Sequence, residues 1–205
     1  MSSRRASTST DIALIAGFAA LIAGCALLPA ITVGAGVVPI TLQTFGVLLA
    51  GAVLGAKRGF LAVMLYITVG AAGLPVFSGG ASGLAVLSGP SAGYIAGFPL
   101  AAAMCGFLVE RLPRHKLATS IPLIFLCGLV SSALFIHPLG IAGLVLRADL
   151  TWEAALRLDM TFWPGDVVKN LAMALVATAV HRAFPDLLPN RRTAEPAQPT
   201  THTTA

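Results

Sequence analysis

The stretch "VPITLQTFGVLLAGAVLGAKRG" (residues 38–59) decides the fold class of this chain, because it is an apolar run that ends on two adjacent cations. No charged residue precedes Lys57 and Arg58 within it. An uncharged apolar segment that closes on Lys and Arg is typical of a helix that crosses a membrane and is anchored at its cytoplasmic end. The stretch therefore predicts a membrane-spanning helix over residues 40–56.

Apolar runs of the same kind recur along the whole chain. Of the 205 residues, 57% are hydrophobic and 10% are charged, whereas soluble domains carry about 25% charged residues. The mean hydropathy is +0.88. We therefore predict an all-α membrane protein with a membrane domain over 11–184, a polar tail over 1–10 and a disordered tail over 185–205. The six predicted spans are residues 11–30, 40–56, 59–73, 92–110, 118–137 and 164–184.

The distribution of Lys and Arg predicts how these spans are oriented. With the N-terminus inside, ten basic residues fall on the cytoplasmic side and two on the outer side. The positive-inside rule then places both termini in the cytoplasm. This orientation also brings three long connections to the outer face, where we expect them to cover a binding cavity. The cytoplasmic set is Arg4, Arg5, Lys57, Arg58, Arg111, Arg114, Lys116, Arg182, Arg191 and Arg192, and the outer set is Arg147 and Arg157.

The three outer connections differ in composition. Residues 31–40 form a Gly-rich, uncharged connection that is closed by Pro39. Residues 73–93 are too rich in glycine for a regular helix and too apolar for an aqueous loop, which predicts a re-entrant loop packed against protein. After the fifth span, Thr151 is the expected N-cap of a short amphipathic helix with Glu153 in its first turn.

Asp166 and Lys169 are the strongest candidates for ligand binding, because a charge inside a membrane helix costs about 2.5 to 3.5 kcal/mol on insertion scales. Residues at i and i+3 share a helix face. The pair either forms a salt bridge at the outer interface, or lines a cavity in which Lys169 binds a carboxylate and Asp166 accepts hydrogen bonds from N–H donors. Asn170 offers an amide contact to the ligand or a hydrogen bond between helices.

Further candidates lie at the outer ends of the predicted spans. Gln43 and its neighbour Thr44 either contact a ligand or hydrogen-bond to another helix. The aromatic residues Phe77, Tyr94 and Trp163 lie where aromatic belts are common, and also next to the loops that should close the cavity. His137 is expected to be an interfacial histidine whose hydrogen bonds are satisfied.

The first predicted span, "DIALIAGFAALIAGCALL", contains overlapping pairs of small residues four positions apart. Such a surface lets another helix approach closely. The pattern alone favours an internal neighbour over a partner subunit. The residues of this surface are Ala16, Ala19, Ala20 and Ala23.

Several functional classes find no support in the sequence. Cys25, Cys105 and Cys127 lie in apolar runs without metal-ligand spacing, so we expect small core residues rather than a disulfide or a metal site. The net charge of +5 is dispersed between hydrophobic segments, which argues against nucleic-acid binding. A Walker A motif and the HExxH and GxSxG motifs are absent from the sequence, and no cofactor is expected.

Four motifs together carry a resemblance to a known family. "PITLQT" (39–44), "GLPVF" (73–77), "GPSAGY" (89–94) and "PGD" (164–166) followed by Lys169 closely resemble the BioY family, the biotin-capturing S components of energy-coupling factor (ECF) transporters. The resemblance extends over roughly residues 11–184.

The resemblance implies a six-helix S-component bundle in the bacterial inner membrane whose outer loops cover a biotin pocket. It implies biotin contacts from Asp166 and Lys169 at the two polar ends of the vitamin, and a pocket completed by Gln43, Phe77, Ser78, Gly79, Tyr94, Trp163 and Asn170. Where some relatives have Asn or Arg after "GLPVF", this chain has "SGGASG", so Ser78 and the backbone of Gly79 and Gly80 would replace them.

The resemblance also implies partners. Family S components dock through small residues of the first helix onto a transmembrane coupling protein that two ABC-type ATPases drive, which makes Ala16, Ala19, Ala20 and Ala23 a partner site. The expected function is biotin uptake without covalent chemistry. The alternatives are an S component for another small vitamin, a biotin transporter that works without its ATPases, and a membrane enzyme that uses Asp166 or His137 as a base.

Overall fold

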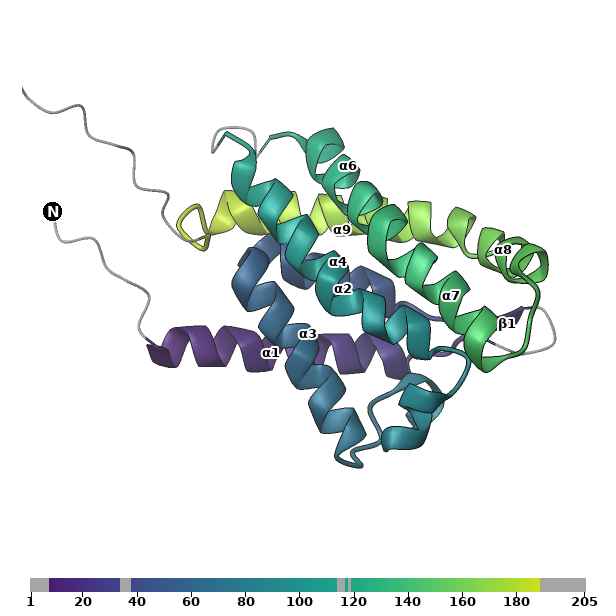
Figure 1. The fold of residues 1–205 in the computed structure, drawn as a ribbon. Helices are drawn as coiled ribbons and strands as arrows, with labels where there is room; N and C mark the ends of the chain where they lie inside the picture. Colours follow the sequence, from purple (N-terminus) through teal and green to yellow (C-terminus); the bar gives the residue numbers. More distant parts are fainter. Residues whose placement is uncertain (1–7, 34–37, 114–116, 118, 189–205) are drawn as a thin grey trace, which may run out of the picture.

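The structure, a computed structural model, describes residues 8–33, 38–113, 117 and 119–188. Within these residues the chain is a bundle of apolar helices with one small β-ribbon at its edge (Figure 1). The long helices are α1 (Thr8–Leu27), α2 (Gln43–Leu54), α3 (Ala56–Ala71), α4 (Ala92–Arg111), α6 (Ile121–Ser131), α7 (His137–Arg147) and α9 (Trp163–Ala183).

Helices fall on all six predicted spans, and the predicted all-α architecture is confirmed. Within the described residues, three helical runs are long and apolar enough to cross a membrane by themselves. They are α1, α4 and the continuous run Ile121–Arg147. Helix α2 is also apolar but shorter, and it ends at Gly55, whose φ of 84° begins a sharp turn into α3.

The fifth span was predicted to end at His137, and this boundary is wrong. The helix passes from α6 through a π-helical segment, η3 (Ser132–Ile136), into α7. Pro138 explains the π-segment, because proline has no N–H to donate and its ring clashes with the carbonyl four residues earlier. A wider turn relieves both problems without breaking the helix. Residues 138–147 are therefore helix rather than outer connection.

The connection over residues 31–40, predicted only as a Gly-rich and uncharged segment, contains two strands. β1 (Ile31–Val33) pairs antiparallel with β2 (Val38–Ile40), with Ile31 opposite Ile40. These strands consist largely of β-branched residues, which favour extended backbone. The ribbon leads directly into Thr41 and the start of α2, and so it fixes the entry to that helix.

The glycine-rich connection between α3 and α4 contains two short 3₁₀ turns, η1 (Ser78–Gly80) and η2 (Leu84–Ser88). It has no longer helix, as predicted. The backbone has positive φ at Gly73, Gly79, Gly80 and Gly83, a conformation that side chains disfavour. Phe77 anchors this loop, because its ring is 1% exposed and packs against Gly70.

The short amphipathic helix predicted after the fifth span is confirmed as α8 (Trp152–Met160). The Thr151 side chain accepts a hydrogen bond from the Ala154 N–H at 3.2 Å, which makes Thr151 the N-cap. Glu153 lies in the first turn and pairs with Arg157 on the exposed face. The opposite face of α8 carries the buried residues Ala155 and Asp159.

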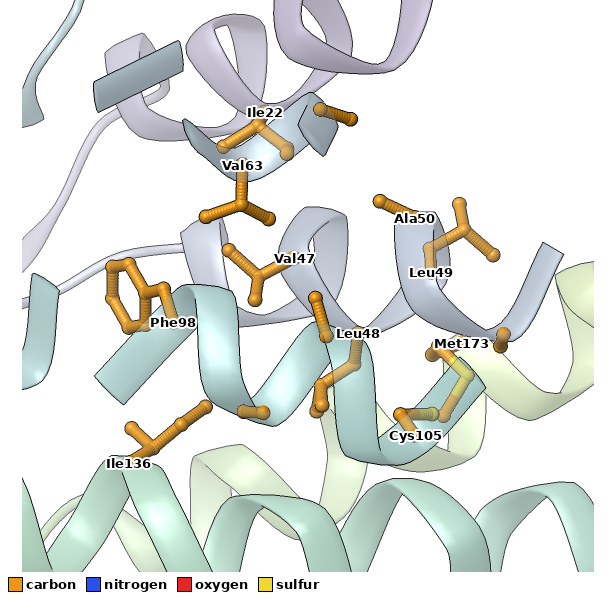
Figure 2. Close-up of a cluster of buried hydrophobic side chains, with 14 of the residues drawn as sticks. Ile22, Val47, Leu48, Leu49, Ala50, Val63, Phe98, Cys105, Ile136 and Met173 are labelled. Atoms are coloured by element: carbon orange, nitrogen blue, oxygen red, sulfur yellow. The ribbon is translucent and has the colours of Figure 1, made fainter. Parts of the chain in front are cut away.

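Small residues hold the helices close together. A side chain at Gly51 in α2 would collide with the carbonyl oxygen of Ala102 in α4 at 2.2 Å. A side chain at Gly93 in α4 would collide with α7, where Gly143 faces it. Such contacts supply van der Waals packing where lipid offers no hydrophobic driving force between helices. Figure 2 shows part of the hydrophobic core, where buried side chains of α1, α2, α3, α4, α9 and the π-segment meet.

The start of α1 and the end of α9 lie at the same end of the bundle, and α8 and β1 lie at the opposite end (Figure 1). Part of the predicted C-terminal tail is packed, since Leu188 is 7% exposed and the Leu187 carbonyl accepts a hydrogen bond from Arg58. Residues 8–10 of the predicted N-terminal tail are helical instead, because α1 begins at Thr8. Residues 1–7 and 189–205 lie outside the described residues, as do several of the predicted cytoplasmic cations. Those cations are Arg4, Arg5, Arg114, Lys116, Arg191 and Arg192.

The three cysteines are buried and free. Cys25 lies in α1, Cys105 in α4 and Cys127 in α6. Their predicted role as small core residues is confirmed.

Candidate functional site

A cavity of about 310 Å³ lies at the end of the bundle that carries the β-ribbon and the glycine-rich loop. This volume is at the lower end of the roughly 300 to 1,000 Å³ typical of small-molecule sites. Its walls are largely apolar, with a few polar groups. The lining residues are Val38, Pro39, Ile40, Thr41, Gln43, Thr44, Phe77, Ser78, Ala81, Val86, Gly89, Pro90, Ser91, Tyr94, Ile95, Phe98, Ile136, Phe162, Asp166 and Lys169.

Asp166 and Lys169 both line this cavity from the first turns of α9. The side chain of Asp166 is 7% exposed and that of Lys169 is 12% exposed, and the Lys169 Nζ lies 2.5 Å from the Asp166 Oδ1. The pair is therefore an ion pair inside the protein rather than one at the outer surface. A buried pair needs further hydrogen bonds to offset its desolvation.

The start of α2 supplies those hydrogen bonds. The Thr44 hydroxyl donates to Asp166 Oδ1 at 3.1 Å, and the Lys169 Nζ donates to the Thr41 carbonyl oxygen at 3.1 Å. Thr41 and Thr44 thus fix the α9 pair to the segment that follows the β-ribbon. The β-ribbon leads into Thr41 and so sets the position of the carbonyl oxygen that accepts the hydrogen bond from Lys169.

Gln43 is 6% exposed, and its side-chain amide donates to the Tyr66 hydroxyl in α3 at 2.9 Å. It also lines the cavity. The two interpretations offered by the sequence, ligand contact and helix-to-helix hydrogen bond, are therefore compatible, because the same side chain is placed for both.

Aromatic rings form much of the apolar wall. Phe77 packs edge-on against Tyr66 with ring centroids 5.5 Å apart, and Tyr94 packs edge-on against Phe162 at 5.6 Å. Edge-to-face pairs of this kind are favourable beyond their buried area. Phe77, Tyr94 and Phe162 all line the cavity.

Three of the residues predicted for the site do not line the cavity. Trp163 stacks on the His137 ring with centroids 4.4 Å apart. Asn170 lies one turn further along α9, where its side-chain N–H₂ donates to the Asp166 carbonyl oxygen at 3.1 Å. Gly79 is exposed in the loop beside Ser78, which does line the cavity. Trp163 and Asn170 therefore support the cavity wall from behind.

The structure also places residues at this site that the sequence did not indicate. Asp159 in α8 is 0% exposed and accepts hydrogen bonds from the Tyr94 hydroxyl at 2.9 Å and from the Trp163 indole N–H at 3.2 Å. His137, predicted to be a satisfied interfacial residue, is 4% exposed and has its Nδ1 3.0 Å from both Asp159 oxygens. The signal for Asp159 was its position on the apolar face of an amphipathic helix, four residues after Ala155.

The small residues of α1 do not share one environment. Ala16 and Ala20 are exposed, Ala23 is half-buried and Ala19 is buried in the core. Ala16 and Ala20 therefore lie on the exposed side of α1, and Ala19 lies where this side meets the core.

Comparison with known proteins matches this chain to one family. The BioY family matches over residues 1–186. The biotin transporter BioY of Rhizobium etli is 40% identical over 186 residues, which cover 90% of this chain and 99% of that protein. The biotin transporter BioY of Rhodobacter capsulatus is 42% identical over 190 residues, which cover 87% of this chain and 96% of that protein.

A solved structure has the same fold. The crystal structure of the S component for biotin from an ECF-type ABC transporter superposes with a TM-score of 0.80. The two sequences are 25% identical, and the match covers 88% of this chain and 95% of that chain.

Proposed function

The chain belongs to the BioY family, and from that premise we propose that it captures biotin and moves it into the cell as the S component of an ECF-type ABC transporter. The observation that carries the proposal is a largely apolar cavity into which a buried ion pair, Asp166 with Lys169, projects from one helix. This family is one of transporters rather than of enzymes, so binding and release are its task.

The chemistry of biotin matches the cavity. Biotin joins an apolar sulfur-containing ring and an aliphatic valerate chain to two polar groups, the ureido group and the carboxylate. The rings of Phe77, Tyr94, Phe98 and Phe162 supply an apolar enclosure for the ring and the chain. Only a few lining residues are polar, so the two polar groups of the ligand determine its orientation.

We assign Asp166 and Lys169 to one end of biotin, the ureido group. The two side chains are in contact, so they present an acceptor and a donor side by side. A ureido group offers an N–H and a carbonyl oxygen in the same adjacent arrangement. Asp166 accepts the N–H and Lys169 donates to the carbonyl. This proposal differs from the expectation that each residue meets a different end, and the contact between the two side chains supports it.

The valerate carboxylate then faces the wall formed by the glycine-rich loop. Ser78 and Ser91 line the cavity there and carry hydroxyl donors. Gly79, next to Ser78, is exposed and has no side chain, so its backbone can be approached closely by a ligand. Hydroxyl and backbone N–H groups are sufficient for a carboxylate that remains partly solvated.

The finer architecture is part of the same proposal. Six spans with both termini in the cytoplasm are supported by the positive-inside distribution and by the shared end at which α1 begins and α9 ends. The site would then face the outside of the bacterial inner membrane. We propose that the exposed face of α1, with Ala16 and Ala20, docks onto a transmembrane coupling subunit that two ABC ATPases drive.

Calorimetry with biotin on the purified full-length chain tests the proposed function. The expected result is binding of one biotin per chain that thiamine, riboflavin and pantothenate do not displace. Displacement by one of these would instead indicate an S component for that vitamin, and no binding of any of them would reject capture. Biotin uptake by cells that lack coupling subunits would show that this chain transports without ATPases.

A further inference from the structure

A second buried acidic group lies behind the cavity wall and has no role in the proposal so far. Asp159, at the end of α8, gathers donors from three other helices: Tyr94 from α4, His137 from α7 and Trp163 from α9. A fully buried carboxylate with this many partners is costly to desolvate, and it persists only when its partners are well placed. Of these residues, Tyr94 alone lines the cavity.

His137 connects this carboxylate to the ion pair of Asp166 and Lys169. Its Nδ1 lies 3.0 Å from Asp159, and its Nε2 lies 3.7 Å from the Asp166 Oδ2. The other Asp166 oxygen, Oδ1, contacts Lys169. The imidazole therefore lies between two carboxylates, one of which lines the cavity.

The donor chemistry of the imidazole decides its charge in this arrangement. An ionised carboxylate only accepts hydrogen bonds, so the Nδ1 next to Asp159 must carry a proton. A neutral ring would then turn the lone pair of its Nε2 toward Asp166, which also accepts only. The contact is attractive when both ring nitrogens carry protons. The cluster then holds two carboxylates and two cations, His137 and Lys169, and its charges balance.

The surroundings hold the ring in this position. The Trp163 ring stacks on His137 with an interplanar angle of 16°, and the face of an indole also attracts a cation. Among the described residues, the ionisable groups in this hydrogen-bonded cluster are Tyr94, Asp159, Asp166 and Lys169, from α4, α8 and α9. Glu153 and Arg157 of α8 pair with each other on the exposed face.

We propose that His137, oriented by Asp159, is a positioning residue that fixes the Asp166 carboxylate for the ligand, and that it does so in its protonated form. This inference rests on the proposed function, in which Asp166 accepts a hydrogen bond from biotin. His137 itself contacts no ligand, because it does not line the cavity. It acts by holding the second oxygen of Asp166, which fixes the orientation of the carboxylate that Thr44 and Lys169 contact through its first oxygen.

The π-segment is the reason that His137 can reach both acids. Residues Ser132–Ile136 form the wide turn immediately before it, and Pro138 follows it. A π-turn shifts the angular register of the residues that follow it, and such turns are frequent at functional sites. The local distortion therefore aims one imidazole between α8 and α9.

A double-mutant cycle tests the proposal. Biotin Kd is measured by calorimetry for the full-length wild type, His137→Gln, Asp166→Asn and the double variant. Gln retains one N–H for Asp159 but carries no charge. We expect His137→Gln to weaken binding by about tenfold or more in the wild-type background and by less than about twofold in the Asp166→Asn background. Equal losses in both backgrounds, or no loss in the wild type, would overturn the proposal.

His181→Gln is the matched control. His181 is 3% exposed in α9, and its Nε2 lies 2.9 Å from the Ala52 carbonyl oxygen, away from the cavity-lining residues. Its replacement should leave biotin Kd within about twofold of the wild type. A wild type that binds no biotin would reject the proposed function itself, whereas a wild type that binds but shows an additive cycle would reject only the role of His137.

The protonation state of the ring adds a readout that a purely structural role would not change. Nitrogen-15 NMR distinguishes an imidazole with protons on both ring nitrogens from either neutral tautomer. The His137→Gln variant identifies the His137 signals by their loss, and the proposal expects both of its ring nitrogens to carry protons in the wild type. A neutral tautomer of His137 would overturn the proposal.

Discussion

Lys169 has one neighbour of opposite charge and one backbone acceptor, and it is nearly enclosed. Its Nζ contacts Asp166 and donates to the Thr41 carbonyl oxygen at 3.1 Å. An ammonium group has three donors. Two are used by these partners, and the third is left for a ligand in the cavity that Lys169 lines. In the proposed function Lys169 is therefore expected to act both as a structural cation and as a donor to the ligand.

Replacing Lys169 with Ala should therefore weaken biotin binding by about 2 kcal/mol or more, because it removes a donor and leaves Asp166 unbalanced in a desolvated site. Calorimetry measures this as a rise in Kd of about thirtyfold or more. Lys57→Ala is the control, since Lys57 is exposed in the first turn of α3. An unchanged Kd for Lys169→Ala would remove this residue from the site.

The methyl ester of biotin separates the two ends of the ligand. If Lys169 binds the ureido group, Lys169→Ala should weaken the ester and free biotin by the same factor, because the ureido group is present in both. Calorimetric titration of the ester into the wild type and into Lys169→Ala, alongside the same titrations with biotin, provides the test. A loss seen with biotin but absent with the ester would assign Lys169 to the carboxylate instead.

At this scale the sequence indicated the ion pair that lines the cavity, but not the residues that support it. Two opposite charges at i and i+3 near the start of an apolar helix stand out because intramembrane charge is costly. Asp159 does not stand out, because it follows Glu153 and Arg157 in a helix that looks interfacial. Its burial depends on Tyr94 and His137, which come from helices far away in the chain, and no local pattern encodes that meeting.

At the scale of elements, the crossing of α4 and α7 determines the shape of the cavity wall. Gly93 and Gly143 face each other at this crossing, and Tyr94, next to Gly93, lines the cavity. A Cβ at Gly93 would lie 2.1 Å from the Leu139 carbonyl oxygen and 2.8 Å from the Gly143 Cα. These are backbone atoms, so the helices themselves would have to separate.

Gly93→Ala should therefore destabilise the purified protein by about 1 to 3 kcal/mol, the usual cost of overpacking. It should also weaken biotin binding, because Tyr94 moves with the helix. Thermal unfolding in detergent and calorimetry measure the two effects. Gly17→Ala is the matched control, because a Cβ at Gly17 meets no atom within 4 Å. Equal unfolding temperatures for the two variants would contradict the packing argument.

Elements were predictable where one hydrophobic run makes one helix. The start of α4 at Ala92 and of α9 at Trp163 lie within a residue of the predicted spans at 92 and 164. The fifth span failed because Pro138 usually ends a helix, and here a π-turn relieves the clash instead. The β-ribbon was missed because each strand has only three residues, too few for a recognisable alternation.

At the scale of the whole molecule, the exposed face of α1 is the surface expected to couple capture to transport. Ala20→Leu should leave the biotin Kd unchanged, because the residue is exposed and remote from the cavity lining, but it should reduce biotin uptake in cells that contain the coupling subunits. Uptake of radiolabelled biotin and calorimetry measure the two quantities. Ala96→Leu, at an exposed alanine of α4, is the control. Undiminished uptake by Ala20→Leu would place the docking surface elsewhere.

Membrane orientation can be tested with thiol labelling, because the three native cysteines are buried. A membrane-impermeant maleimide applied to intact spheroplasts should label Arg157→Cys on α8 and should not label Lys57→Cys at the start of α3. Both positions are exposed, so lysed cells should show labelling of both. The reverse pattern in intact spheroplasts would invert the proposed orientation.

The anchoring of Phe77 has a consequence for how a ligand enters. The ring of Phe77 packs between Tyr66 and Gly70, and these contacts fix the position of the chain at the start of the loop. Three glycines of positive φ follow, Gly79, Gly80 and Gly83, and the Gly83 N–H donates to the Gly70 carbonyl oxygen at 2.8 Å. We expect the vitamin to enter by rotation about a few of these glycine torsions while the helices stay in place. Exchange of the ligand would then not require the bundle to unfold.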